Sequence, residues 1–391
     1  MRRRRFLRAL GATVAAAGTG QALGCGPGQD RSGAGEKPEG GPDLGGLEPE
    51  DPAPSSLWTA RSTAFQRWTW VHGNADRTPQ EWDRVFGKLA EAGFTGVLVG
   101  GDPSVTVSEG AHQNGLEFHR WVWTLNRNGD TWVKENHPEW FTVSRNRDSS
   151  LTVPPYVGYY RWLCPTKAGV KEYLRDSMSA VAENTTVDGV HLDYVRHCDV
   201  ILPRGLWSKY DLVQDRELPE FDYCYCETCR QEFGALTGRD PLAMADPSAD
   251  EEWRRFRWDS VTALVRVLAD AVHGAGKPIS AAVFPTPTVA RRLVRQSWDE
   301  WPLDAFFPML YHEFYEEGLE WIGRGVEEGL ADLGLTGEPG ENTAPAPKLF
   351  AGLYLPTLNR DGNRREAVEV ARQAGADGVS FFEMGGLGLG G

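Results

Sequence analysis

The sequence predicts a (β/α)8 barrel, in which eight parallel strands form a closed cylinder surrounded by helices. Short runs rich in β-branched and aromatic residues alternate with amphipathic helical runs between residues 65 and 382. Eight alternating pairs in sequence are typical of a closed parallel barrel. An open doubly wound sheet is the alternative with the same alternation, but no glycine-rich phosphate-binding turn follows the first strand.

The period of the apolar residues locates each element in turn. We predict strands at residues 65–71, 94–99, 116–124, 187–194, 279–284, 303–311, 349–355 and 377–382. We predict helices between them at residues 79–92, 167–183, 251–274, 289–299, 319–333 and 364–374. The first helix is preceded by Thr78, a typical N-cap residue, and begins with Pro79, which favours the first helical position.

Two predicted loops, residues 125–165 and 195–250, are far longer than the roughly 2–6 residues usual in such folds. They follow the third and fourth strands and therefore leave the C-terminal face of the barrel. Active sites of (β/α)8 proteins lie at this face. We therefore expect both loops to build the functional site.

The N-terminal segment differs in composition from the rest of the chain. Arg2 to Arg5, followed by an apolar run at residues 9–17, are typical of a twin-arginine export signal. The run is shorter than the ~20 residues of a membrane-spanning helix, so we expect cleavage. Ala22-Leu23-Gly24-Cys25 resembles a lipoprotein box, which would make Cys25 the lipidated first residue of an exported, cell-surface protein.

The following segment is rich in Gly, Pro, Glu and Asp, which predicts a flexible, disordered linker. We therefore expect an export signal at residues 1–25, a linker at 26–60 and the (β/α)8 domain at 61–391. The net charge of −14 argues against nucleic acid as a partner. Fifteen Trp and eleven Tyr offer many planar faces on which sugar rings stack, although most aromatic residues of any protein are core.

The fourth predicted strand contains the main catalytic candidate. Within it, Val190 and Leu192 alternate with His191 and Asp193, so the strand has one apolar and one polar face. Helices cover the outside of the barrel, which places the polar face in its interior or mouth. Asp193 ends the strand, where barrel enzymes place catalytic groups. The alternative is a structural aspartate that caps a loop.

The third strand alternates in the same way, with His119, Trp121 and Trp123 on one face. If this face points inwards, it supplies a polar group and two stacking platforms beside Asp193; an aromatic core layer is the alternative. Asn126 lies just beyond and is a candidate for hydroxyl recognition. Core packing is the alternative for Tyr311 and Tyr354. The further substrate-binding candidates, in the long loops and on or after the strands, are Trp162, His191, Tyr194, Arg196, Tyr311 and Tyr354.

A second acid must come from another strand end. Glu313 follows the sixth strand on the alternating face of Met309 and Tyr311, and Glu383 follows the eighth strand before a glycine turn. Either residue could instead be salt-bridged and structural. The sequence does not distinguish these two candidates.

The cysteines predict a metal site. Cys224, Cys226 and Cys229 form C-x-C-x-x-C, which presents three thiolates to one point, and Cys164 and Cys198 lie upstream. A fourth thiolate from another loop would complete a tetrahedral, structural zinc site with no open position. Disulfides are the alternative in an exported protein, but five cysteines cannot all pair. No motif indicates an organic cofactor.

The motif Val-Asp-Gly-Val-His-Leu-Asp-Tyr-Val-Arg at residues 187–196 resembles the bacterial glycosyl-hydrolase-like family 10. His119-Arg120-Trp121 resembles the family's third-strand His-Ala-Trp, with Arg120 as the departure, and His137-Pro138-Glu139-Trp140 resembles its His-Pro-x-Trp. The resemblance spans residues 65–382. It implies an exported, often lipid-anchored barrel with glycosidase character.

A narrower resemblance links Cys164-Pro165-Thr166 and the C-x-C-x-x-C motif to the zinc loop of family 42 β-galactosidases. That resemblance implies Cys164, rather than Cys198, as the fourth zinc ligand. The Asn-Glu acid/base pair of those enzymes is absent here, because Leu192-Asp193 stands near its place. Their mechanism is therefore not carried over.

Our hypothesis from the sequence is an exported glycoside hydrolase that cleaves a poly- or oligosaccharide with two carboxyl groups. Asp193 would be the nucleophile or base, with a pKa lowered by its surroundings, and Glu383 or Glu313 would be the acid, with a raised pKa. The alternatives are a non-catalytic carbohydrate-binding barrel of the cell envelope and a metal-dependent hydrolase. The last would require a zinc ion with an open position.

Overall fold

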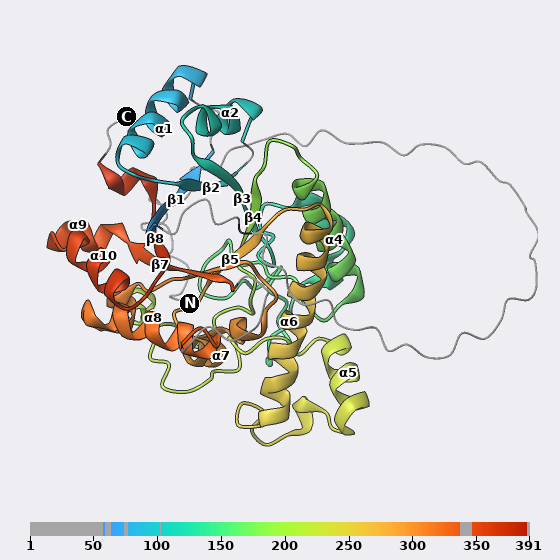
Figure 1. Cartoon of the computed structure of the whole chain (residues 1–391). Helices are drawn as coiled ribbons and strands as arrows, with labels where there is room; N and C mark the ends of the chain where they lie inside the picture. The colour runs from blue at the N-terminus through green and yellow to red at the C-terminus, as the bar shows by residue number, and fades with distance from the viewer. Residues whose placement is uncertain (1–57, 59–63, 74–76, 102, 337–345, 389–391) are drawn as a thin grey trace, which may run out of the picture. The chain divides into compact units, whose positions relative to one another are not determined.

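Eight parallel strands pair in sequence order, and the eighth pairs with the first, so that the sheet closes into a barrel (Figure 1). This computed structural model describes residues 58, 64–73, 77–101, 103–336 and 346–388. The predicted export signal, Cys25 and most of the predicted linker lie outside these residues. Within the described part of the chain, no helix combines the length and apolar character needed to cross a bilayer.

The strands are short and most are fully buried, as expected for a sheet covered by helices. They are β1 (Gln66–His72), β2 (Gly96–Gly100), β3 (Glu117–Trp123), β4 (Gly189–Asp193), β5 (Ile279–Val283), β6 (Ala305–Pro308), β7 (Lys348–Tyr354) and β8 (Gly378–Phe382). The structure therefore confirms the predicted (β/α)8 fold. β6 is shorter than predicted, because the backbone N–H of Leu310 donates to the carbonyl of Pro308 and the chain turns there.

Ten α-helices in the described residues lie between or beyond the strands (Figure 1). They are α1 (Pro79–Glu91), α2 (Val105–Gln113), α3 (Thr131–Asn136), α4 (Ala168–Ala182), α5 (Glu227–Thr237), α6 (Glu251–Gly274), α7 (Pro287–Val294), α8 (Glu320–Asp332), α9 (Leu355–Asp361) and α10 (Arg364–Gln373). Thr78 caps α1 as predicted, and its side chain accepts a hydrogen bond from the backbone N–H of Glu81.

Four helices, α2, α3, α5 and α9, were not predicted, and α7 ends early; α2 and α7 show the physical reasons. α2 was not predicted, because its buried face consists of small residues such as Ser108, Gly110 and Ala111 and gives little apolar period. α7 ends five residues earlier than predicted, since Arg295 adopts a left-handed backbone conformation with φ of 57°. Neither difference moves a strand.

Side chains alternate between the two sides of each strand and form two hydrophobic cores. Outward-facing residues such as Val190 and Leu192 pack with the helices. His191 on the same strand lies inside the barrel against Trp70 and Phe307. The buried residues of the inner core are Trp58, Trp68, Trp70, Leu98, Trp121, Ala282, Ala305, Phe307 and Phe350. The predicted inward direction of the polar face of β4 is therefore confirmed at His191, and Trp121 shows that the His-Trp-Trp face of β3, which the sequence left open, also points inwards.

Trp58 corrects the boundary expected for the linker. Its ring lies 5.2 Å from Trp68, 4.8 Å from His119 and 5.4 Å from Phe350, measured between ring centroids. Burial of a large aromatic ring is strongly favourable even at the edge of a polar segment. Trp58 thus belongs to the barrel, although the predicted linker includes it.

The two long loops after β3 and β4 contact each other over the C-terminal face. The backbone N–H of Arg145 donates to the carbonyl of Asp222 (2.9 Å), and that of Tyr225 donates to the carbonyl of Val143 (2.7 Å). Asp222 also forms an ion pair with Arg257 of α6, and both side chains are almost fully buried. These contacts hold the loop after β4 against the barrel wall.

Candidate active site

Asp193 lies at the C-terminal end of β4, where two hydrogen bonds fix its carboxyl group. Oδ2 accepts a hydrogen bond from Trp121 Nε1 (2.9 Å), and Oδ1 accepts one from the backbone N–H of Tyr194 (2.7 Å). Burial raises the pKa of Asp193 and outweighs the lowering effect of these bonds and of Arg196. This direction differs from the lowered pKa expected from the sequence, because a sequence does not show how far the protein removes water from a carboxyl.

Aromatic rings stand on two sides of the barrel mouth. The first group comes from β3, β4 and the loop after β3: Trp123 lies 4.7 Å from Tyr194 and 6.3 Å from Tyr159 between ring centroids. All three are at least partly exposed. The group offers flat faces at the end of β3 and β4, as predicted for Trp123 and Tyr194.

The second group comes from the ends of β6, β7 and β8. Tyr311 lies 5.2 Å from Tyr354, and Tyr354 stacks on Phe382 at 6.4 Å. The ring of Tyr311 also lies 6.4 Å from that of Phe382, which lies 6.5 Å from the ring of Trp121, the donor to Asp193. Burial raises the pKa of Tyr311, and the charge of Asp193 contributes to that rise. The structure therefore brings Tyr311 and Tyr354 to the mouth together with Asp193.

Glu383 follows β8 and reaches the same region. Its Oε2 lies 2.7 Å from Nε2 of His72, at the end of β1, and both side chains are close to half exposed. The His72 ring lies 5.2 Å from the ring of Trp121, which in turn donates to Asp193. Asp193 and Glu383 are thus linked through two intervening side chains.

Glu313 has different surroundings. Arg360 of α9 donates hydrogen bonds to both of its carboxylate oxygens, and the hydroxyl of Thr357 donates to Oε2 over 2.7 Å. Arg360 and Thr357 lower the pKa of Glu313, with Arg360 having the larger effect. A carboxylate held in this way is suited to an ion pair rather than to proton donation.

The two histidines predicted to bind substrate are buried in the barrel interior. His119 is fully buried among Trp58 and Trp68, and its Nε2 lies 3.5 Å from Glu117. His191 is also fully buried, with Nδ1 2.9 Å from the Ser280 hydroxyl, and burial lowers its pKa. Neither side chain is exposed at the mouth. Inward-facing side chains that lie deeper in the barrel than the strand ends fill its core.

Asn126, Trp162 and Arg196 are likewise buried and do not line an open surface. Asn126 Oδ1 accepts a hydrogen bond from the backbone N–H of Arg161 (3.3 Å). Arg196 forms an ion pair with Asp199 (3.0 Å) and lies over the ring of Trp162. Their burial differs from the sequence-based expectation of an exposed binding surface, and Trp162 and Arg196 instead contact the ring of Tyr194.

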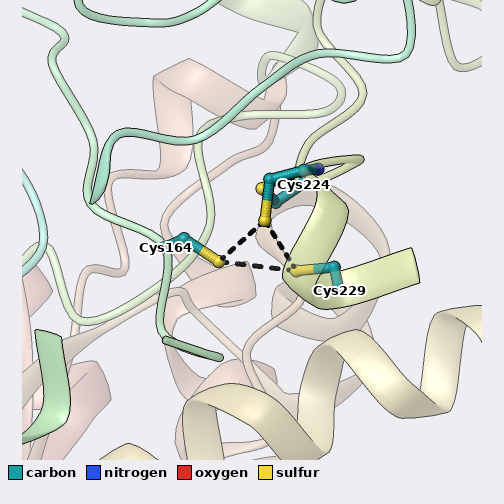
Figure 2. Close-up of side chains that lie close together, drawn as sticks. Cys164, Cys224 and Cys229 are labelled. Carbon is teal, nitrogen blue, oxygen red and sulfur yellow. Dashed lines mark hydrogen bonds between the residues drawn. The ribbon is translucent and has the colours of Figure 1, made fainter. Parts of the chain in front are cut away.

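Four cysteines converge between the two long loops. Cys164 lies in the loop after β3, and Cys224, Cys226 and Cys229 precede or begin α5. All four are buried. Figure 2 shows Cys164, Cys224 and Cys229 pointing toward one another. The Cys164 Sγ lies 3.7 Å from that of Cys226 and 3.4 Å from that of Cys229, and the four sulfurs lie within 4.8 Å of one another. Among the described residues, this is the cluster able to hold a metal ion, and Cys198 is not part of it.

The geometry fits a tetrahedral thiolate site. Zinc–sulfur bonds of ~2.3 Å place the sulfurs of such a site roughly 3.8 Å apart. The five described cysteines are all free, so the disulfide alternative is not seen among them. A metal ion bound to four thiolates would have no open position, and it would join the two loops beside the mouth.

Three residues of the mouth were not predicted: His72, Tyr159 and Phe382. His72 had a usable signal, because it follows Trp68 and Trp70 at intervals of two on one strand. The alternation that selected Asp193 on β4 also selects His72 on β1. Tyr159 lies in an irregular loop, where no period indicates direction.

No model of a known protein family matches the chain, and no curated protein matches its sequence. Solved structures do match it. The PgaB (BpsB) glycoside hydrolase domain from Bordetella bronchiseptica is similar over 81% of this chain and 94% of its own, with a TM-score of 0.56 and 12% identity. The β-amylase catalytic domain from Paenibacillus polymyxa is similar over 83% and 94%, with a TM-score of 0.56 and 10% identity. These likenesses confirm the barrel fold.

Proposed function

We propose that this protein is an exported glycoside hydrolase that cleaves a poly- or oligosaccharide at the mouth of its barrel. The observation that carries the proposal is the partly buried carboxyl of Asp193, which accepts a hydrogen bond from Trp121, lies among aromatic rings at the end of β4 and has a raised pKa. The fold shared with a glycoside hydrolase domain and a β-amylase supports it. We also propose, from the sequence motifs, that the chain is related to glycosyl-hydrolase-like family 10.

Glycoside cleavage requires a proton for the leaving oxygen and a carboxylate that attacks the anomeric carbon or activates water. We assign proton donation to Asp193, because its raised pKa favours the protonated form. Glu383, beside the imidazole of His72, would supply the carboxylate. This assignment reverses the roles expected from the sequence and leaves Glu313 in its ion pair with Arg360.

The aromatic groups on two sides of the mouth suit a substrate with several sugar rings. Trp123 and Tyr159 would stack on rings at the β3 side, and Tyr311 and Tyr354 on rings at the β6 side. Asp193 would then reach a glycosidic oxygen between them. This arrangement favours an oligomeric chain over a monosaccharide glycoside.

The four-cysteine cluster would hold Zn²⁺ in a structural role. Cys164 would supply one thiolate from the loop after β3, and three would come from the loop after β4. A filled thiolate site would fix both loops in the positions that place Tyr159 and Tyr194 at the mouth. It would take no part in bond cleavage.

Export and lipid attachment at Cys25 complete the proposal. Intact-mass analysis of protein isolated from a bacterial membrane fraction should show a mature chain that begins at Cys25 and carries diacylglycerol. A soluble mature chain with another first residue would remove the anchor from the proposal.

The decisive test incubates the purified protein with a panel of polysaccharides, including peptidoglycan, and detects released fragments by mass spectrometry. We expect cleavage by the wild type and none by Asp193→Asn, with sugar binding retained by both. Binding without cleavage by the wild type would instead favour a non-catalytic carbohydrate-binding barrel. Cleavage retained by Asp193→Asn would remove Asp193 from the mechanism.

A further inference from the structure

His72 contacts Glu383, one of the two proposed catalytic carboxyls, and Trp121, which donates a hydrogen bond to the other, Asp193. Its Nε2 is 2.7 Å from Oε2 of Glu383. Its ring lies 5.2 Å from Trp121, with an angle of 52° between the ring planes. Trp121 holds Asp193 through a hydrogen bond of 2.9 Å.

This contact depends on the strand between β1 and β3. β2 ends at Gly100, which is the register partner of His72. A Cβ atom at Gly100 would lie only 2.5 Å from Cε3 of Trp121, so the indole occupies the space that a side chain would need. The absence of a side chain on β2 therefore lets the Trp121 ring extend over this strand toward His72.

We propose that His72 is a positioning residue for both carboxyls, an inference that rests on the proposed glycoside hydrolase function. Its Nε2–H donates to Glu383 and orients the carboxylate, while its ring supports the indole that orients Asp193. An ordinary surface ion pair contributes little to stability and nothing to catalysis. The contact with Trp121 is what distinguishes His72 from such a pair.

The variants His72→Ala and His72→Gln test this role, because the glutamine amide can replace the Nε2–H donor. We expect His72→Ala to lower kcat about 10-fold or more with little change in KM, since small displacements of catalytic groups are costly. His72→Gln should recover the part of the lost kcat that depends on donation to Glu383, because its amide replaces the donor but not the ring that supports Trp121. The matched control is His112→Ala, since His112 also pairs with a carboxylate, Asp188, at 2.8 Å and with similar exposure.

An unchanged kcat in His72→Ala, or an equal loss in His112→Ala, would overturn the inference while leaving the proposed function intact. So would a failure of His72→Gln to recover activity in a variant that melts at the wild-type temperature. A wild-type protein that cleaves no glycoside would end the proposed function and, with it, the positioning role.

A second measurement tests the contact without using activity. The chain has eight histidines, and the His72 side-chain ¹⁵N resonances are assigned by their loss in His72→Gln. We expect Glu383→Gln to shift the His72 Nε2 resonance and to leave that of His112 unchanged. An unshifted His72 resonance would overturn the proposed donation to Glu383.

Discussion

Trp121 donates a hydrogen bond from its indole Nε1 to Oδ2 of Asp193 over 2.9 Å. The bond favours the ionised carboxyl and opposes the burial that raises the pKa of Asp193. The two effects together set the pH range in which Asp193 can donate a proton.

Trp121→Phe removes the donor and keeps a ring. We expect the pKa of Asp193 to rise further, because the ionised form loses a stabilising hydrogen bond. If Asp193 is the acid, the alkaline limb of the kcat/KM profile should move to higher pH. Trp123→Phe is the control, since the carboxyl of Asp193 accepts its hydrogen bonds from Trp121 and from the backbone N–H of Tyr194. An unmoved limb in Trp121→Phe would contradict the assignment of Asp193.

Asp193→Asn should remove about 10²-fold to 10⁴-fold of the activity, the usual contribution of a general acid. It should also stabilise the fold at neutral pH. Folding raises the pKa of Asp193, so the native state binds this proton more tightly than the unfolded state does. The stability of the wild type therefore falls as the pH rises from the unfolded pKa through the native pKa, and the asparagine variant lacks this loss. Thermal melting at pH 7 checks this, and a lower melting temperature in Asp193→Asn would contradict it.

Glu383→Gln and Glu313→Gln should separate the two candidates for the carboxylate that works with Asp193. We expect Glu383→Gln to abolish hydrolysis, whereas Glu313→Gln should keep at least about a tenth of it, because Glu313 is already engaged by Arg360 and Thr357. Steady-state rates on one oligosaccharide measure both. The opposite ranking would place Glu313 in the mechanism and leave Glu383 with its partner His72 as a structural pair.

Cys229→Ser should release the metal ion. We expect about one zinc per wild-type chain by mass spectrometry of metals, and little in the variant, together with a lower melting temperature. Cys198→Ser is the matched control, because Cys198 is a buried cysteine outside the cluster. Equal metal content in all three proteins, including a content of zero, would refute the zinc proposal.

Arg257→Met should destabilise the protein by about 3–5 kcal/mol, because it leaves Asp222 as an unpaired charge in the interior. Arg255→Ala breaks an exposed ion pair with Asp259 on the same helix and should cost at most ~1 kcal/mol. Urea unfolding at pH 7 compares the two. A similar cost for both variants would mean that the Asp222–Arg257 pair does not hold the loop after β4.

The order of the eight strands and of six of the helices was determined by the sequence itself, because each of these elements carries its own apolar period. The period of two on β4 predicted that His191 and Asp193 face inwards, and the structure confirms this for His191. The C-x-C-x-x-C spacing predicted three cysteines at one point, and a resemblance correctly added Cys164 as the fourth. Local pattern was sufficient for the strand faces and for the three-cysteine motif, since residues close in sequence determine both.

Only the tertiary structure decided how deeply each predicted residue lies. His119 and Asp193 share an inward face, yet His119 is fully buried in the core while Asp193 lies at the mouth. The pairing of Glu313 with Arg360, and of Glu383 with His72, joins segments that lie far apart in the sequence. The depth of each side chain and its pairing partner follow from the closure of the barrel. Closure brings together residues that are distant in the sequence, so their separation along the chain does not predict their distance in space.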